Sequence, residues 1–155
     1  MDYKDKVVIV TGGAQGIGKC IAEEFRKQGA LVEVIDKQEG LDHFVGDLSN
    51  RYAIEEFTKL VIEKYGKVDY IINNALPLMK GLDECTWEEF QYALAVGITA
   101  PFYLVKLLVP YLAEGASIVN KESRIPSPIQ ISIIASVLRR NVPNTPILSV
   151  EQPQN

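Results

Sequence analysis

The chain has 155 residues, of which 47% are hydrophobic and 23% are charged, and this composition fits one globular domain with a sizeable core. The formal net charge of −4 leaves no basic surface for nucleic acid, and one histidine with two widely spaced cysteines disfavours a metal site. The sequence shows no signal pattern at its start and no run approaching the roughly 18 apolar residues that span a bilayer, so we expect a cytoplasmic protein without membrane contact.

The first predicted elements are a strand, a glycine-rich turn and a helix. Residues 6–10 form a β-branched run that predicts a buried parallel strand. Residues 19–28 carry apolar side chains at helical spacing, and Gly29 would end this helix. Glycines at such a turn let the backbone approach an anionic ligand, whose charge meets the free N–H groups and positive dipole end of the helix. The glycines of the turn are Gly12, Gly13, Gly16 and Gly18.

A second apolar strand, residues 31–36, ends in the carboxylate of Asp36, 18 residues after Gly18. A carboxylate at this place can accept hydrogen bonds from both hydroxyls of an adenosine ribose, and it would repel a 2′-phosphate. The turn and Asp36 together predict dinucleotide binding with NAD favoured over NADP, although the neighbouring Lys37 works against that preference. The alternative is a solvated strand end without a ligand.

Three further elements continue the alternation of strand and helix. The segment 43–46 predicts a short strand, and Ser49 is expected to be the N-cap of a helix over residues 51–64. Gly66 ends that helix, and residues 68–73 form the fourth predicted strand.

A long helical region is predicted from the capping box at Thr86 to about Leu112, with Pro101 and Pro110 as kinks or breaks. Residues 117–120 form the fifth predicted strand. This alternation predicts an α/β fold, a doubly wound parallel sheet of about five strands in the order 3-2-1-4-5, with helices on both faces in the three-layer Rossmann arrangement. Ligands bind at the carboxyl ends of such strands. The residues expected there are Gly12, Asp36, Asp47 and Asn73.

Four motifs in this order resemble the short-chain dehydrogenase/reductase family, over residues 5 to about 120. They are the glycine turn, Asp36, the pair Asp47-Leu48, and Asn73-Asn74-Ala75. The resemblance implies an extended Rossmann fold that transfers hydride between a nicotinamide and a small alcohol or carbonyl substrate.

The resemblance also implies a role for each motif in binding NAD. The glycine turn, with Gln15 and Ile17, would hold the pyrophosphate, and Asp36 would hold the adenosine ribose. Gln15 stands where family members that prefer NADP often carry a basic residue, which again favours NAD. The remaining motifs would flank the adenine (Asp47 and Leu48) and line the nicotinamide ribose (Asn73, Asn74 and Ala75).

The chain departs from the family pattern at two positions before residue 120. Leu76 replaces the glycine of the family's Asn-Ala-Gly, and it places a bulky side chain where the backbone passes close to the cofactor. Gly97 stands where the family has an asparagine that supports a proton-relay water. The alternative interpretation of Gly97 is a tolerated helix glycine, which costs about 1 kcal/mol relative to alanine.

The family's Tyr-x-x-x-Lys motif is absent from this chain. Ser123 falls in the register of the catalytic serine, but Ser136 and Arg140 stand where the tyrosine and the lysine are expected. All seven tyrosines lie at or before Tyr111, and Lys121 is the last lysine. Because the tyrosine transfers the proton in this chemistry, we expect negligible turnover.

The composition changes near residue 120, which divides the chain into an NAD-binding Rossmann domain over 1–120 and an atypical tail over 121–155. Residues 129–133 alternate like a strand and could add a sixth strand, whereas 141–155 are expected to be disordered. One hypothesis is that the tail arises from a frame change.

Two functions stay open. The first is an NAD-dependent oxidoreductase that binds its cofactor but is catalytically impaired. The second is a non-catalytic dinucleotide-binding module or a truncated, non-functional product. A homo-oligomer is also open, because the family's dimer helices are only partly present.

Overall fold

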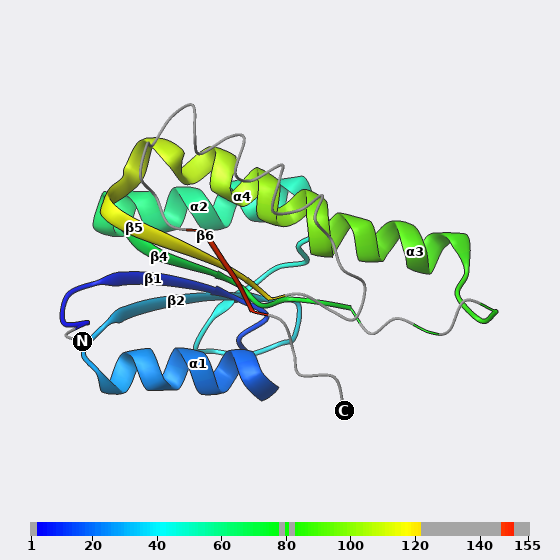
Figure 1. Ribbon diagram of the computed structural model, residues 1–155, viewed down its shortest axis with the longest axis horizontal. Coiled ribbons are helices and arrows are strands. Elements are labelled where there is room, and N and C mark those ends of the chain that lie inside the picture. Colours follow the sequence, from blue (N-terminus) through cyan, green and yellow to red (C-terminus); the bar gives the residue numbers. More distant parts are fainter. Residues whose placement is uncertain (1–2, 78–79, 81–82, 122–146, 151–155) are drawn as a thin grey trace.

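The computed structural model describes residues 3–77, 80, 83–121 and 147–150. Within them, parallel strands form one sheet in the order β3-β2-β1-β4-β5-β6. Figure 1 shows α1 on one face of this sheet and α2 and α4 on the other. The predicted Rossmann arrangement and the order of its first five strands are confirmed. The strands are β1 (Val7–Thr11), β2 (Leu31–Asp36), β3 (Phe44–Val45), β4 (Val68–Asn73), β5 (Leu112–Lys121) and β6 (Ile147–Val150).

The helices are α1 (Gly16–Lys27), α2 (Arg51–Tyr65), α3 (Trp87–Leu94) and α4 (Ala100–Leu108), with a π-helical segment at Ala95–Thr99 and a 3₁₀ turn at Val109–Tyr111.

Two hydrophobic clusters hold the layers together, one on each face of the sheet. Strand β1 supplies both, because successive side chains of a strand point to opposite faces. Val7 and Ile9 pack with Phe57 of α2 and Leu104 of α4, whereas Val8 packs in the cluster beneath α1. All four residues of the β1 run 7–10 are fully buried, as a strand covered on both faces requires.

The N-cap of α2 is Asn50 and not the predicted Ser49. The Asn50 side chain accepts a hydrogen bond from the Tyr52 N–H at 3.0 Å. The Ser49 N–H donates to Asp47 Oδ1 at 2.8 Å, which forms a local turn before the helix begins. Serine and asparagine are both favourable N-caps. The turn at Asp47 therefore decides which of them takes that position.

The helical region from Trp87 to Tyr111 is continuous through Pro101. Proline has no N–H to donate to the preceding turn, and the five residues before α4 adopt π geometry, with Ala100 N donating to Ala95 O. At Pro110 the helix tightens into the 3₁₀ turn that precedes β5. Both prolines change the helix type, and only the second lies at its end.

This helical region also corrects the prediction that no segment is long and apolar enough to span a membrane. An 18-residue window within Trp87–Tyr111 reaches a mean hydropathy of 1.7. The core helix of a globular domain passes the same test, and Leu104, Val105 and Leu108 are fully buried among the residues of the core. Core packing therefore accounts for part of the apolar character of this helix, since 39% of the window is buried.

The last two strands differ from the prediction. β5 begins at Leu112, five residues before the predicted start, and its pairing with β4 shifts register between Val68 and Tyr70. Gly115, with φ +76°, lies in this irregular part. β6 adds to β5 in parallel and comes from Ile147–Val150, so the prediction that all of 141–155 is disordered is wrong for these four residues. The segment 129–133 lies outside the described residues.

Candidate functional site

The glycine turn is packed so closely that at two of its glycines a side chain would collide with neighbouring backbone atoms. A Cβ at Gly18 would lie 2.1 Å from Gly12 O and 2.4 Å from Asn74 Nδ2. A Cβ at Gly12, where φ is +66°, would lie 2.9 Å from the Cα of Ala75. These contacts fix the end of β1 against the start of α1 and the end of β4. The turn is therefore closely packed at Gly12 and Gly18.

The N-terminus of α1 faces open space. In the part of the chain that the structure describes, no atom lies within 4 Å of a Cβ built on Gly16. The N-cap residue Gln15 makes no side-chain cap, and the first turn contains no acidic residue. The N-termini of α2 and α3, in contrast, are capped by Asn50 and Thr86. Free N–H groups and a positive dipole end thus remain available to an anion beside the glycine turn.

Asp36 lies directly beside this turn and is almost completely buried. Its Oδ2 accepts a hydrogen bond from Ala14 N at 3.0 Å, and its Oδ1 accepts one from Gln38 N at 3.0 Å. A carboxylate offers about four acceptor positions, and two of those of Asp36 carry no hydrogen bond from the described residues. The carboxylate is held in place by the same turn that would bind a pyrophosphate.

Asp47 belongs to a polar bridge, which we define as Lys37, Tyr92 and Asp47. The Lys37 ammonium donates to Tyr92 Oη at 3.3 Å and lies 5.1 Å from the centre of its ring. The Tyr92 hydroxyl donates to the Asp47 carboxylate, with oxygen distances of 3.3 and 3.2 Å. The hydrogen bond to Tyr92 raises the pKa of Lys37 above its ordinary value, with further attraction from Asp47 and Asp36. The bridge joins the chain after β2, the chain after β3 and α3.

Leu48, the other residue predicted to flank an adenine, is buried in the core cluster that contains Phe57. Its described contacts are those of a core side chain. An adenine contact at Leu48 stays a prediction.

The end of β4 is fastened to the end of β1 by several hydrogen bonds. Thr11 Oγ1 accepts from the N–H groups of Asn74 and Ala75 at 3.1 and 3.0 Å. Asn74 Nδ2 donates in return to the carbonyl oxygens of Thr11 and Gly12 at 3.1 and 2.9 Å. Asn74 and Ala75 therefore position the glycine turn.

A buried amide pair lies at the ends of β4 and β5. Asn73 Nδ2 donates to Asn120 Oδ1 at 2.8 Å, and both residues are buried. Among the described residues, Asn73 Oδ1 and Asn120 Nδ2 have no hydrogen-bond partner. Lys121 Nζ donates to Asn74 Oδ1 at 3.4 Å. Asn120 and Lys121 were not predicted as site residues. Asn120 ends the fifth predicted strand and Lys121 follows it directly, and this position could have indicated both.

The two departures from the family pattern meet in space. Among the described residues, the only atom within 4 Å of a Cβ built on Gly97, outside its local helix, is Leu76 Cδ2 at 3.6 Å. The Leu76 side chain thus lies beside the position where a longer side chain at residue 97 would extend. Ser123, Ser136 and Arg140 lie outside the described residues.

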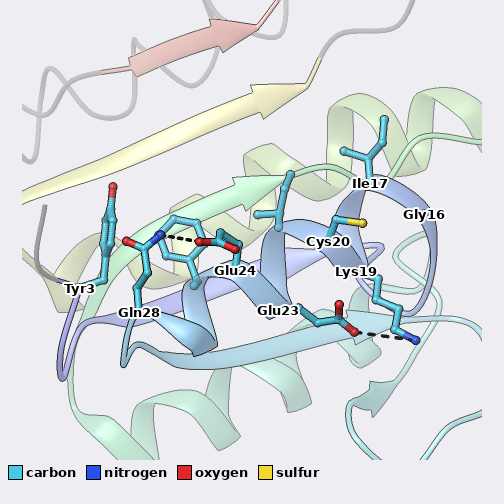
Figure 2. Close-up of a pocket in the computed structure, with 10 residues that line it drawn as sticks. Tyr3, Gly16, Ile17, Lys19, Cys20, Glu23, Glu24 and Gln28 are labelled. Carbon is cyan, nitrogen blue, oxygen red and sulfur yellow. Dashed lines mark hydrogen bonds and ion pairs between the residues drawn. The ribbon is translucent and has the colours of Figure 1, made fainter.

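An open groove of about 780 Å³ runs along α1 (Figure 2). Ile17, Ile21 and Phe25 give it apolar walls. It shares Gly16 and Ile17 with the predicted pyrophosphate site, but Asp36, the polar bridge and the end of β4 are not among its lining residues. The groove therefore lies beside the candidate site.

The profile of the short chain dehydrogenase family matches residues 6–127 of this sequence. The chain belongs to this family. Its members bind a nicotinamide dinucleotide, which agrees with the turn and carboxylate described above. The match extends seven residues beyond the predicted limit of the resemblance, into the segment that contains Ser123.

Curated relatives support the same assignment. An uncharacterized oxidoreductase of Thermotoga maritima is 32% identical over 141 residues, which cover 79% of this chain and 55% of the relative. Momilactone A synthase of Oryza sativa is 32% identical over 138 residues, covering 76% of this chain and 50% of that enzyme. The chain thus spans about half the length of the curated relatives it matches.

Solved structures show the same fold. A short-chain dehydrogenase from Burkholderia cenocepacia in complex with NADP is 25% identical, with a TM-score of 0.74 over 88% of this chain and 64% of that one. A glucose/ribitol dehydrogenase-type structure from Brucella melitensis reaches a TM-score of 0.81 at 23% identity, covering 96% of this chain and 76% of that one.

Proposed function

We propose that this chain binds NAD(H) at the carboxyl edge of its sheet, with the adenosine ribose on Asp36. The observation that carries the proposal is the Asp36 carboxylate, hydrogen-bonded to Ala14 of the glycine turn and adjacent to the uncapped N-terminus of α1. We call the glycine turn, Asp36 and Asp47 the adenosine end of the site. The nicotinamide end comprises residues 73–76, Gly97 and Asn120.

The residues of both ends fit the cofactor. At the adenosine end, the free N–H groups of α1 would bind the pyrophosphate, and the free acceptor positions of Asp36 would bind the two ribose hydroxyls. At the nicotinamide end, Asn73 and Asn120 each keep one buried polar atom without a hydrogen-bond partner among the described residues. Asp36 also supports a preference for NAD, because its negative charge opposes a 2′-phosphate.

The bound nicotinamide would supply hydride transfer to or from a small alcohol or carbonyl compound. The protein must also supply a proton donor close to the substrate oxygen, and such general acid catalysis is worth roughly 10²–10⁴ in rate. Every tyrosine of this chain lies at or before Tyr111, so a Tyr-x-x-x-Lys motif is absent after β5. Ser123 is the remaining candidate, and its hydroxyl is a much weaker acid than a tyrosine. We therefore propose that turnover is impaired.

The absence of a Tyr-x-x-x-Lys motif also favours the second candidate, a dinucleotide-binding module without catalysis. The two candidates differ in one measurable quantity, the rate of NADH consumption by protein that is shown to bind NADH. Fluorescence titration should give saturable, micromolar binding, and a screen of alcohols and ketones followed by NADH absorbance should give no rate above background. Clear turnover would contradict the proposed impairment, whereas absence of binding would contradict the proposed function itself.

The proposal also includes a cytoplasmic location, which rests on the sequence composition alone. A homo-oligomer stays a prediction from the family resemblance.

A further inference from the structure

The polar bridge lies beside the group that is expected to select the cofactor. Lys37 follows Asp36 directly in sequence, and its ammonium is attracted by the carboxylates of both Asp47 and Asp36. If the adenosine ribose binds to Asp36, this ammonium is the cation nearest in sequence to the 2′ position. A freely placed cation here would favour a 2′-phosphate and weaken the preference that Asp36 creates.

The structure shows where this cation is held. The Lys37 ammonium donates to the Tyr92 hydroxyl and lies over the Tyr92 ring, and the same hydroxyl donates its proton to Asp47. A hydroxyl can accept one hydrogen bond while it donates another, so the three groups form one continuous hydrogen-bonded chain. Cation–π attraction and the nearby carboxylate both favour this position of the ammonium.

Resting on the proposed function, we propose that Tyr92 determines cofactor preference by holding the Lys37 ammonium at its hydroxyl, which is itself hydrogen-bonded to Asp47. In this arrangement a 2′-phosphate would have to compete with the Tyr92 hydroxyl for the ammonium. Lys37 therefore does not act as a phosphate-binding residue, and the charge of Asp36 decides the preference for NAD. Tyr92 is a positioning residue that acts through Lys37.

The decisive variant is Tyr92→Phe, which keeps the ring but removes the hydroxyl. With its hydrogen bond to Tyr92 lost, the Lys37 ammonium becomes available to the cofactor. The affinity for NADP⁺ should rise about fivefold, while the affinity for NAD⁺ changes less than about twofold. Competition against NADH fluorescence measures both affinities, and these two nucleotides differ only in the 2′-phosphate.

Two further variants separate this effect from a general loosening of the site. Tyr103→Phe is the matched control, because the Tyr103 hydroxyl donates to Glu55 of α2 and lies outside the bridge. It should leave the ratio of the two affinities unchanged. The double variant Lys37→Met/Tyr92→Phe should lose the gain in NADP⁺ affinity, because the released cation is gone.

The outcomes separate the inference from the proposed function. If wild-type protein binds NAD⁺ and Tyr92→Phe leaves the NADP⁺ to NAD⁺ affinity ratio unchanged, the role of Tyr92 is overturned and the proposed function stands. If the double variant keeps the gain, Lys37 is not the group released and the inference is equally overturned. If wild-type protein binds neither nucleotide, both the inference and the proposed function fall.

Discussion

The adenosine end and the nicotinamide end lie on the same edge of one sheet, but they follow the family pattern to different degrees. At the adenosine end, the backbones of Gly12 and Gly18 pack closely, and the Asp36 carboxylate accepts a hydrogen bond from Ala14 N of the same turn. At the nicotinamide end, Leu76 and Gly97 replace the family's glycine and asparagine, and a Cβ at residue 97 would lie 3.6 Å from Leu76 Cδ2. In the proposed function, the ribose and the pyrophosphate bind at the adenosine end, whereas Ser123, the remaining candidate for proton transfer, follows β5 in the sequence. The two functions can therefore be lost separately.

The largest expected effect is at Gly18 of the adenosine end, where a side chain would collide with neighbouring backbone atoms. Gly18→Ala would place a Cβ 2.1 Å from Gly12 O, and we expect it to lower the free energy of unfolding by at least about 3 kcal/mol. Gly16→Ala is the matched control, because its Cβ would meet no atom of the described residues within 4 Å. Only the left-handed backbone at Gly16, with φ +57°, should destabilise this variant, by about 1–2 kcal/mol. Urea denaturation measures both, and equal losses would contradict the described packing of the turn.

The next effect concerns binding at the adenosine end. Asp36→Asn removes the negative charge that is proposed to bind the ribose, and hydrogen bonds to charged groups predict a roughly 10–100-fold weaker affinity for NADH. Asp42→Asn makes the same charge change at an exposed position of the β2–β3 connection and should leave the affinity unchanged. NADH fluorescence titration compares the variants. An unaltered affinity in Asp36→Asn would place the adenosine elsewhere.

A third prediction concerns Asp69, which lies near the start of β4, at the edge of the sheet opposite the candidate site. A substitution there should change the stability of the fold and leave the affinity for NADH unchanged. Burial opposes ionisation of Asp69, but hydrogen bonds from Val7 N, Lys6 and Lys67 outweigh it and lower the pKa of this carboxyl below its ordinary value. A lowered pKa contributes stability that is present above about pH 4 and is lost as the pH falls through the pKa of the folded state. Asp69→Asn should therefore lower the free energy of unfolding by about 1–3 kcal/mol at pH 7.

This difference from wild type should shrink as the pH falls below 4, while NADH affinity at pH 7 stays the same for the folded variant. Thermal denaturation at several pH values tests the first part. A difference that is constant with pH would show that the Asp69 carboxylate is not the source of the stability.

The smallest expected effect is the coupling between Leu76 and Gly97. Gly97→Asn should be destabilising in the presence of Leu76, whereas the double variant with Leu76→Gly should recover about 0.5–1 kcal/mol relative to the sum of the single changes. Gly97→Ala is the control, because a contact of 3.6 Å is an ordinary one and alanine favours the helix. If the free-energy changes of the two single variants add up to that of the double variant, the residues do not share this space.

The elements that the sequence predicted well are those whose pattern is local. The β1 run and the glycine turn carry their structure in consecutive residues, so both were found. The N-cap of α2 was placed one residue too early, because Ser49 and Asn50 are both good caps and a side chain outside the helix decides between them. The early start of β5 was missed because Glu114 and Gly115 resemble a loop, and they lie where the pairing of β5 with β4 shifts register.

The parts of the site that the sequence did not predict depend on tertiary contacts. Lys37 and Tyr92 are 55 residues apart, and no periodicity connects them. Asn73 and Asn120 become partners only because β4 and β5 are neighbours in register. Leu76 and Gly97 were recognised as separate departures, and their contact required the packing of the long helix over the end of β4.

The most direct test of the central claim is a crystal structure of this chain grown with NADH. The account predicts density for the adenosine ribose with both hydroxyls within hydrogen-bond distance of the Asp36 carboxylate, and the pyrophosphate at the N-terminus of α1. Adenosine bound away from Asp36 would contradict it.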